Sequence, residues 1–126
     1  MKLWILIFVG GGVGSLCRFL VGKLINGPTV SGFPYGTFVV NVTGCFLIGF
    51  FVFYFTEARF GLASLPWRLF LVTGICGGYT TFSAFSIENV NLITNNQVFT
   101  FLAYTFASLL VGLLATYSGV LLAKNI

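Results

Sequence analysis

The sequence predicts an all-α membrane protein that forms one four-helix transmembrane domain over residues 1–126, with its third helix broken. Of the residues, 58% are hydrophobic and only 6% are charged, and the mean hydropathy is +1.05, which lies far outside the range of soluble globular proteins. Four long apolar runs cover roughly residues 3–25, 36–56, 67–94 and 98–124. Each run suits a bilayer crossing of roughly 20 residues, and together they leave no room for a soluble module.

Charge and composition exclude several classes of function. The six Lys and Arg residues give a net charge of +4 and are scattered at the ends of the apolar runs, as expected for membrane-interface anchors rather than a nucleic-acid surface. The three cysteines lie inside apolar runs without metal-ligand spacing, and we interpret them as small buried residues. With no His and with Glu57 and Glu88 as the only carboxylates, we expect no enzymatic activity.

The first run is rich in glycine and contains one charge. Gly10 and Gly14 are four residues apart, so they share a helix face and would let a neighbouring helix approach closely. Arg18 lies toward the far end of the run, where its guanidinium either snorkels or caps backbone carbonyls, or takes part in gating. The run continues past Arg18 to Ile25, longer than the apolar core of a signal peptide, so we expect the mature protein to keep this helix.

The second run contains a buried amide. A turn-rich connector over about residues 26–35 precedes the run. Asn41 lies within roughly 10 Å of the start of the run at 1.5 Å per residue. Such an amide either hydrogen-bonds a neighbouring helix or lines a polar pathway. The third run is unusual as well, and two polar insertions in so short a chain favour one shared pathway.

The third run contains the most unusual segment of the chain. Residues 77–86 place paired glycines, four Ser/Thr residues and two phenylalanines where a crossing should be uniformly apolar, and we predict that the helix breaks here. The freed backbone groups cost several kcal/mol each in hydrocarbon, so a bound ion, a partner chain or a water-lined path is needed to satisfy them. Glu88 falls near the end of the run, where we expect it to reach water or, preferably, to pair with a cation.

The fourth run carries polar groups on one helix face. Tyr104, Ser108, Gly112 and Thr116 follow one another at intervals of four residues and therefore form a stripe. An isolated hydroxyl in a membrane helix often bonds to its own backbone, but three hydroxyls on one stripe favour a polar track.

These features together suit a small hydrated anion. A pore past Asn41, the broken segment and the stripe would offer N–H and O–H donors with almost no fixed charge, so an anion could lose part of its hydration shell and still leave. Phe82 and Phe85 are three residues apart, and the partially positive edges of their rings could contact an anion. Core packing is the alternative reading of two phenylalanines in a chain that has 16.

Two motifs resemble the signatures of the Fluc fluoride channels, small four-helix proteins of bacterial plasma membranes. They are Gly36-Thr37-x-x-Val40-Asn41 and Gly77-Gly78-x-Thr80-Thr81-Phe82-Ser83-x-Phe85-Ser86-x-Glu88. The length, the number of runs and the glycine-rich first run with Arg18 agree, so the resemblance covers essentially the whole chain. It implies an antiparallel homodimer with dual topology in the bacterial inner membrane, with two pathways that passively release fluoride and so relieve fluoride toxicity.

The resemblance also implies roles for single residues. Phe82 and Phe85 would line the pathway with their ring edges, and Asn41 would donate to fluoride. Further polar contacts would come from Ser83, Tyr104 and Ser108. Gly112 departs from the family pattern, because a further hydroxyl is expected at this position, and the resemblance leaves open whether Thr116 substitutes for it.

A structural Na⁺ is the cofactor that the resemblance implies. Backbone carbonyls of Gly77 and Thr80 from both subunits would hold it at the dimer interface, where it would satisfy the carbonyls freed by the break. Thr81 belongs to the same motif and would support the site, while Arg18 and Glu88 would lie nearer the ends of the pathway.

Two readings compete with the fluoride channel. A proton-coupled cation exporter of the small multidrug type is also a dimer of four-helix chains, but it needs a titratable carboxylate deep in the membrane, and only Glu88 could serve. A passive structural subunit would leave the polar break unexplained.

The distribution of positive charge bears on dual topology. If the termini share a side, Lys2, Arg59, Arg68 and Lys124 lie there, against Arg18 and Lys23, which weakly favours termini on the inside.

Overall fold

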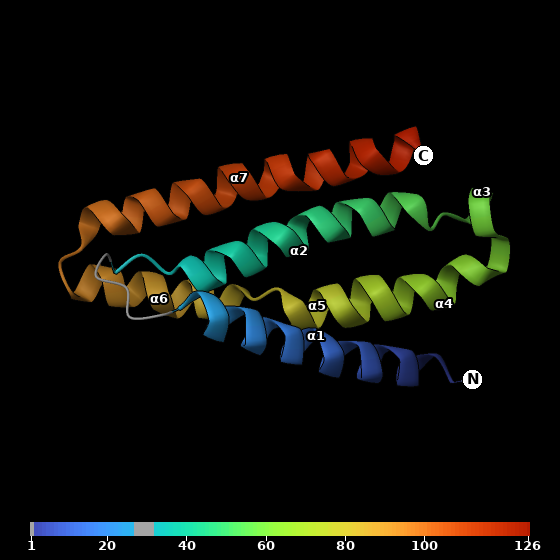
Figure 1. The fold of residues 1–126 in the computed structure, drawn as a ribbon, viewed down its shortest axis with the longest axis horizontal. Helices are drawn as coiled ribbons and strands as arrows, with labels where there is room; N and C mark the ends of the chain where they lie inside the picture. The colour runs from blue at the N-terminus through green and yellow to red at the C-terminus, as the bar shows by residue number, and fades with distance from the viewer. Residues whose placement is uncertain (1, 27–31) are drawn as a thin grey trace.

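The structure is a computed structural model of the chain, and it describes residues 2–26 and 32–126. Four helical segments within these ranges are long and apolar enough to cross a membrane, which confirms the predicted multi-pass, all-helical fold (Figure 1). They are α1 (Leu3–Ile25), α2 (Tyr35–Tyr54), a composite third crossing over Glu57–Thr94, and α7 (Val98–Asn125). Both termini lie at the same end of the bundle. Much of the connector predicted over residues 26–35 lies outside the described residues.

The third crossing is assembled from several helical pieces. In chain order they are α3 (Glu57–Phe60), the 3₁₀ turn η1 (Gly61–Ala63), α4 (Ser64–Arg68), the π-helical η2 (Leu69–Cys76), α5 (Gly77–Tyr79) and α6 (Phe82–Thr94). Thr80 has ψ 156° and Thr81 has φ −151° and ψ 121°, so two extended residues separate α5 from α6. The predicted break is therefore present, and it lies at the two threonines and not at the paired glycines.

The paired glycines remain helical, and Gly78 makes a close contact with α1. A Cβ on Gly78 would meet the backbone carbonyl of Gly11, and a Cβ on Gly14 would meet the backbone carbonyl of Ile75. Gly10 is likewise buried against the third crossing. The close approach predicted for Gly10 and Gly14 is thus confirmed, and its partner surface runs along η2 and α5.

Helices α2 and α7 form the other half of the bundle. They run side by side over most of their length, and their contact is the most extensive in the molecule (Figure 1). Glycines again set the separation, since a Cβ on Gly49 would meet the carbonyl of Thr116 and a Cβ on Gly119 would meet the carbonyl of Phe46. The break in the third crossing faces the middle of α2, as the contacts of Asn41 with Thr81 show.

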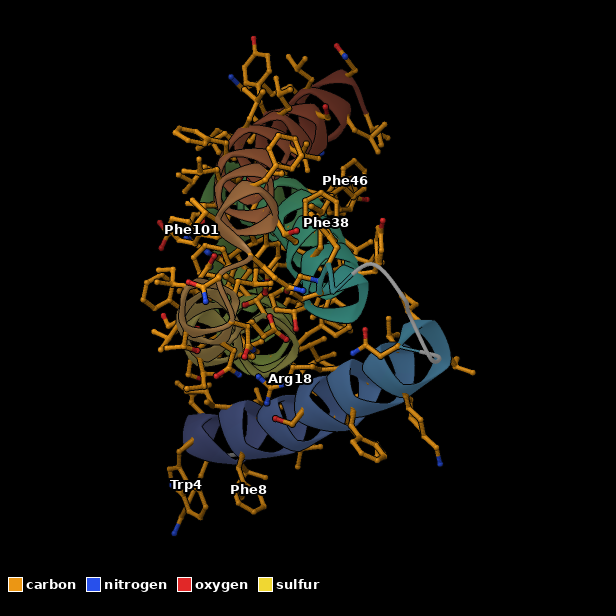
Figure 2. The ribbon with its side chains drawn as sticks, turned by 90° about the vertical axis from the view of Figure 1, so that its left-hand side faces the viewer. Trp4, Phe8, Arg18, Phe38, Phe46 and Phe101 are labelled. Carbon is orange, nitrogen blue, oxygen red and sulfur yellow. The ribbon has the colours of Figure 1, made fainter. Side chains whose placement is uncertain are left out.

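Helix α1 presents opposite faces to protein and to the membrane. Trp4 and Phe8 project away from the bundle and are 63% and 80% exposed, as expected for lipid-facing side chains (Figure 2). Arg18 points the other way, toward the third crossing. One charged side chain of α1 is therefore directed at the break.

Candidate functional site: a hollow at the helix break

The side chain of Asn41 satisfies the backbone at the break. Its Nδ2 donates to the carbonyl oxygen of Thr81 at 3.0 Å, and its Oδ1 accepts from the Thr81 N–H at 2.8 Å. The amide thus pairs with both polar backbone groups of one extended residue, as a neighbouring strand would do. The first of the two roles left open by the sequence, bonding to a neighbouring helix segment, is therefore present in the structure.

Arg18 caps the carbonyl next to this pair. Its Nη1 donates to the carbonyl oxygen of Thr80 at 3.3 Å. The Thr80 side chain turns back into its own helix, where Oγ1 donates to the Cys76 carbonyl at 2.8 Å. Ser15, one turn before Arg18, donates to the Gly78 carbonyl at 3.4 Å. Among the predicted roles of Arg18, carbonyl capping is therefore observed, and the guanidinium lies beside the break itself.

Helix α6 restarts because Thr81 caps it. Thr81 Oγ1 accepts from the Ala84 N–H at 3.2 Å, which is the arrangement of an N-cap residue. The same hydroxyl lies 3.2 Å from Ser83 Oγ. Thr81 therefore contributes its backbone to Asn41 and its side chain to the first turn of α6.

A hollow of about 310 Å³ lies on one side of the break. Its lining residues come from α2, the break, α6 and α7: Asn41, Cys45, Ile48, Thr80, Thr81, Phe82, Phe85, Ser108 and Leu109. Four of the six residues predicted to contact the anion, Asn41, Phe82, Phe85 and Ser108, thus line a single space. The ring centroids of Phe82 and Phe85 are 5.8 Å apart, with 37° between the ring planes.

Ser108 is the polar group in this hollow that lacks a protein partner. Its Oγ is buried, and no hydrogen-bond partner lies near it in the described part of the chain. A buried hydroxyl left unpaired costs about 1–3 kcal/mol, so its position calls for a ligand or a water. The lining of the hollow is mainly apolar, so few groups in it can form a hydrogen bond with a ligand. The hydroxyl of Ser108 is one of these groups.

Ser83 and Tyr104 do not line this hollow. Ser83 lines a second hollow of about 520 Å³, together with Arg18, Thr81, Ala84 and Ile87. The Tyr104 ring is fully buried and lies 5.1 Å from the Phe85 ring, centroid to centroid. Its hydroxyl donates to Glu88 Oε2 at 2.7 Å. Tyr104 therefore supports Phe85 from behind, and its polar atom is held by a carboxylate.

The partners of Glu88 differ from the prediction. In addition to the Tyr104 hydroxyl, Glu88 accepts from Thr37 Oγ1 at 2.6 Å. The cation expected at this carboxylate is thus replaced, among the residues that the structure describes, by two hydroxyls from α2 and α7. The two hydroxyls hold the carboxyl group by hydrogen bonds, and this cluster links α2, α6 and α7 at one point.

Cys45 is a lining residue that the sequence reasoning missed. It was interpreted only as a small buried residue, although it follows Asn41 by four positions and therefore shares its face of α2. Its Sγ lies 3.6 Å from where a Cβ on Gly112 would stand. The thiol thus occupies the space beside the position where the stripe on α7 lacks a side chain. Thr116 does not fill this gap, because its hydroxyl donates to the Gly112 carbonyl in its own helix.

The carbonyls of Gly77 and Thr80 have a chemistry that suits a hard cation. They lie at the C-terminal end of the α5 segment, where helix carbonyls lack intrahelical partners and carry partial negative charge. Gly77 is exposed, and Thr80 offers its carbonyl to the Arg18 guanidinium, itself a cation.

Comparison with known proteins places the chain in a family. A family model described as CrcB-like protein, Camphor Resistance (CrcB), matches residues 5–120. The chain is 45% identical over 127 residues to a protein of Flavobacterium psychrophilum named fluoride-specific ion channel FluC, with 100% of both chains covered. It is also 45% identical to the protein of that name from Bacteroides fragilis, over 94% of each chain, and 44% identical to that from Rhizobium meliloti, over 95% of this chain and 94% of the relative. With the fold, the break and these matches in agreement, the chain belongs to the CrcB family.

Proposed function

We propose that this chain is a fluoride-selective channel that lets fluoride leave the cell passively across the bacterial plasma membrane and so relieves fluoride toxicity. The observation that carries the proposal is the hollow in which Asn41, Phe82, Phe85 and the unpaired hydroxyl of Ser108 meet. The names of the relatives support the choice of fluoride. The proton-coupled cation exporter gains no support from the family, and its one possible carboxylate, Glu88, is engaged by two hydroxyls.

The lining of the hollow explains how a small anion could be held and released. Asn41 uses one N–H for Thr81, and an amide nitrogen has two, so a second donor is left for an anion. The Ser108 hydroxyl and the edges of the Phe82 and Phe85 rings add weak positive potential without a full charge. Such donors replace part of a hydration shell, and the absence of a lysine or arginine from the lining residues keeps the anion from being trapped.

An antiparallel homodimer would complete the site. Phe82 is 79% exposed, so one wall of the hollow faces outward in the single chain. Thr43 is also exposed and lies 2.9 Å from the Tyr79 hydroxyl, oxygen to oxygen, and Gly77 is exposed as well. Polar atoms at this depth are costly against lipid but acceptable against protein, so we infer that a second copy covers this face. Inverted pairing would place two pathways side by side.

A structural Na⁺ at the dimer axis is part of the same proposal. Carbonyls of Gly77 and Thr80 from two chains would surround the ion, and its role would be to balance the partial negative charge of two helix ends that meet. Arg18 donates to the Thr80 carbonyl in the single chain, so the guanidinium and the ion would share that oxygen or exchange places on it.

The decisive experiment is fluoride efflux from liposomes that contain only this protein. We expect a fluoride electrode to record rapid fluoride loss while chloride is retained, and Phe82→Ile to slow the fluoride loss strongly, because an aliphatic side chain has no positive ring edge. Replacing Na⁺ by N-methylglucamine during purification and assay should lower the activity. Retention of fluoride by wild-type liposomes would refute the channel, whereas full activity without Na⁺ would remove only the ion from the proposal.

Dual topology is tested separately by labelling. A cysteine added after Ile126, in a chain whose Cys17 is replaced by serine, should react with a membrane-impermeant maleimide from both sides of the membrane in cells and inverted vesicles. Cys45 and Cys76 are less accessible and remain as internal controls. Labelling from one side alone would contradict the antiparallel arrangement.

A further inference from the structure

Helix α6 carries both phenylalanines of the hollow but is only loosely held by apolar packing. The two extended residues at the break uncouple its rotation from that of α5. Its contact with α7 is far less extensive than that of α2 with α7, and its contact with α2 is smaller still. In a membrane, apolar packing against protein differs little from packing against lipid, so hydrogen bonds weigh more in setting the orientation of such a helix.

Asn89 connects the backbone of Phe85 to α7. Its Nδ2 donates to the Phe85 carbonyl at 2.9 Å, and its Oδ1 accepts from Thr105 Oγ1 at 3.0 Å. Asn89 is only 8% exposed, so both bonds lie away from solvent and lipid. A continuous hydrogen-bonded chain therefore runs from the main chain of Phe85 to the side chain of Thr105.

Thr105 behaves differently from the two hydroxyls of Thr116 and Ser118 in the same helix. Thr116 donates to the carbonyl of Gly112 and Ser118 donates to that of Leu114, each four residues earlier in α7. This is the usual arrangement for Ser and Thr in membrane helices. Thr105 instead directs its hydroxyl across to α6. The bond of Thr105 therefore connects two helices, and Thr116 and Ser118 offer a comparison with hydroxyls that bond only within α7.

Two adjacent bridges fix rotation better than one. Glu88 accepts from Tyr104, and Asn89 accepts from Thr105, so consecutive residues of α6 bond consecutive residues of α7. Consecutive helix residues point about 100° apart, so the two bridges resist turning of α6 about its axis in either direction. Phe82, Phe85 and Asn89 are spaced by three and four residues and lie on one stripe of α6. The face that Asn89 anchors is thus the face that carries the two rings.

We propose that Asn89 and Thr105 form a positioning pair, which sets the rotation of α6 so that the rings of Phe82 and Phe85 face the hollow. The pair touches no permeating ion and acts only through the two phenylalanines. This inference rests on the proposed fluoride channel, because its readout is fluoride selectivity. Loss of the bond should let α6 turn, which would replace ring edges by other groups in the wall of the hollow and admit other anions.

The test compares hydroxyl-deleting variants in liposomes. Thr105→Val removes the bond while keeping the shape, Thr105→Ser keeps a hydroxyl, and Ser118→Ala removes a hydroxyl that bonds only its own helix. Fluoride and chloride efflux are measured at low protein density, where the fraction of liposomes that empty reports the number of active channels. We expect Thr105→Val to lower the ratio of fluoride to chloride efflux about tenfold, and Thr105→Ser and Ser118→Ala to stay within about twofold of wild type.

The outcomes separate positioning from stability. A variant that merely folds less well lowers the fraction of emptying liposomes but leaves the ratio unchanged, and that result for Thr105→Val would overturn the proposal. Asn89→Leu is measured alone and combined with Thr105→Val, and the combined loss should be smaller than the sum of the two single losses because both substitutions break the same bridge, whereas additive losses would contradict a pair. If wild type itself fails to release fluoride, the proposed function fails; if it conducts and Thr105→Val matches it, the positioning pair fails.

Discussion

Replacing Asn41 with aspartate is expected to abolish fluoride efflux. The carboxylate can still accept from the Thr81 N–H, but it has no proton to give to the Thr81 carbonyl, which Asn41 now binds at 3.0 Å. Leaving that carbonyl unpaired costs about 1–3 kcal/mol, and the new negative charge repels any anion in the hollow. We expect efflux to fall by about a hundredfold or more, measured with a fluoride electrode on proteoliposomes.

Two further variants assign the cause of that loss. Asn125→Asp makes the same chemical change at an exposed position near the end of α7, and it should conduct like wild type. Asn41→Leu removes both bonds to Thr81 without adding a charge, whereas Asn41→Asp keeps the bond from the Thr81 N–H, so a larger loss in Asn41→Asp than in Asn41→Leu is due to the charge. If Asn41→Asp released fluoride at nearly the wild-type rate, neither the bond of Asn41 to the Thr81 carbonyl nor a place for Asn41 in the pathway would be needed for conduction.

Adding one methyl group at Gly14 is expected to damage the whole bundle. The new Cβ would overlap the backbone carbonyl of Ile75, which cannot rotate away as a side chain could. Helix α1 would have to move outward, and the bonds of Ser15 and Arg18 to the carbonyls of Gly78 and Thr80 would lengthen or break. Overpacking of this kind costs about 1–3 kcal/mol, so the Gly14→Ala protein should unfold at a lower temperature in detergent.

Gly12→Ala is the matched control in the same helix. A Cβ at Gly12 has nothing within 4 Å, and alanine favours a helix over glycine by about 0.5–1 kcal/mol. The two substitutions should therefore change the unfolding temperature in opposite directions, with Gly12→Ala neutral or slightly stabilising. Equal effects of the two alanines would mean that α1 does not pack closely on η2 and α5.

The sequence predicted the crossings well where apolar runs end at charges or turns. The predicted run 3–25 coincides with α1, since hydrophobicity alone defines its length. The third crossing was predicted to begin at residue 67, but the helical segment starts at Glu57. The stretch between the second and third predicted runs contains Glu57, Arg59 and Pro66, and in the structure these residues lie in short helices at the start of the third crossing.

The site was only partly predictable, because a side chain's residue type does not specify its partner. Asn41 and Ser108 were expected in one polar space, and they are there. Tyr104 lies on the same stripe of α7 as Ser108, but its hydroxyl donates a hydrogen bond to Glu88. This bond depends on the rotation of α6, which the sequence does not specify. The capping of the Thr80 carbonyl by Arg18 also depends on how closely α1 approaches, which the glycines permit but do not reveal.

The position of Arg18 at the break has a consequence for biosynthesis. The Arg18 guanidinium is engaged within the membrane-spanning region, so Lys23 is the remaining cation in the last turns of α1. Lys2 and Lys124 lie next to the two termini, and Arg59 and Arg68 lie in α3 and α4, between the second and third crossings. The insertion machinery would then deliver more copies with cytosolic termini than inverted ones. Under antiparallel pairing, the scarcer orientation would limit the number of complete dimers, and surplus copies of the commoner orientation would remain unpaired in the membrane.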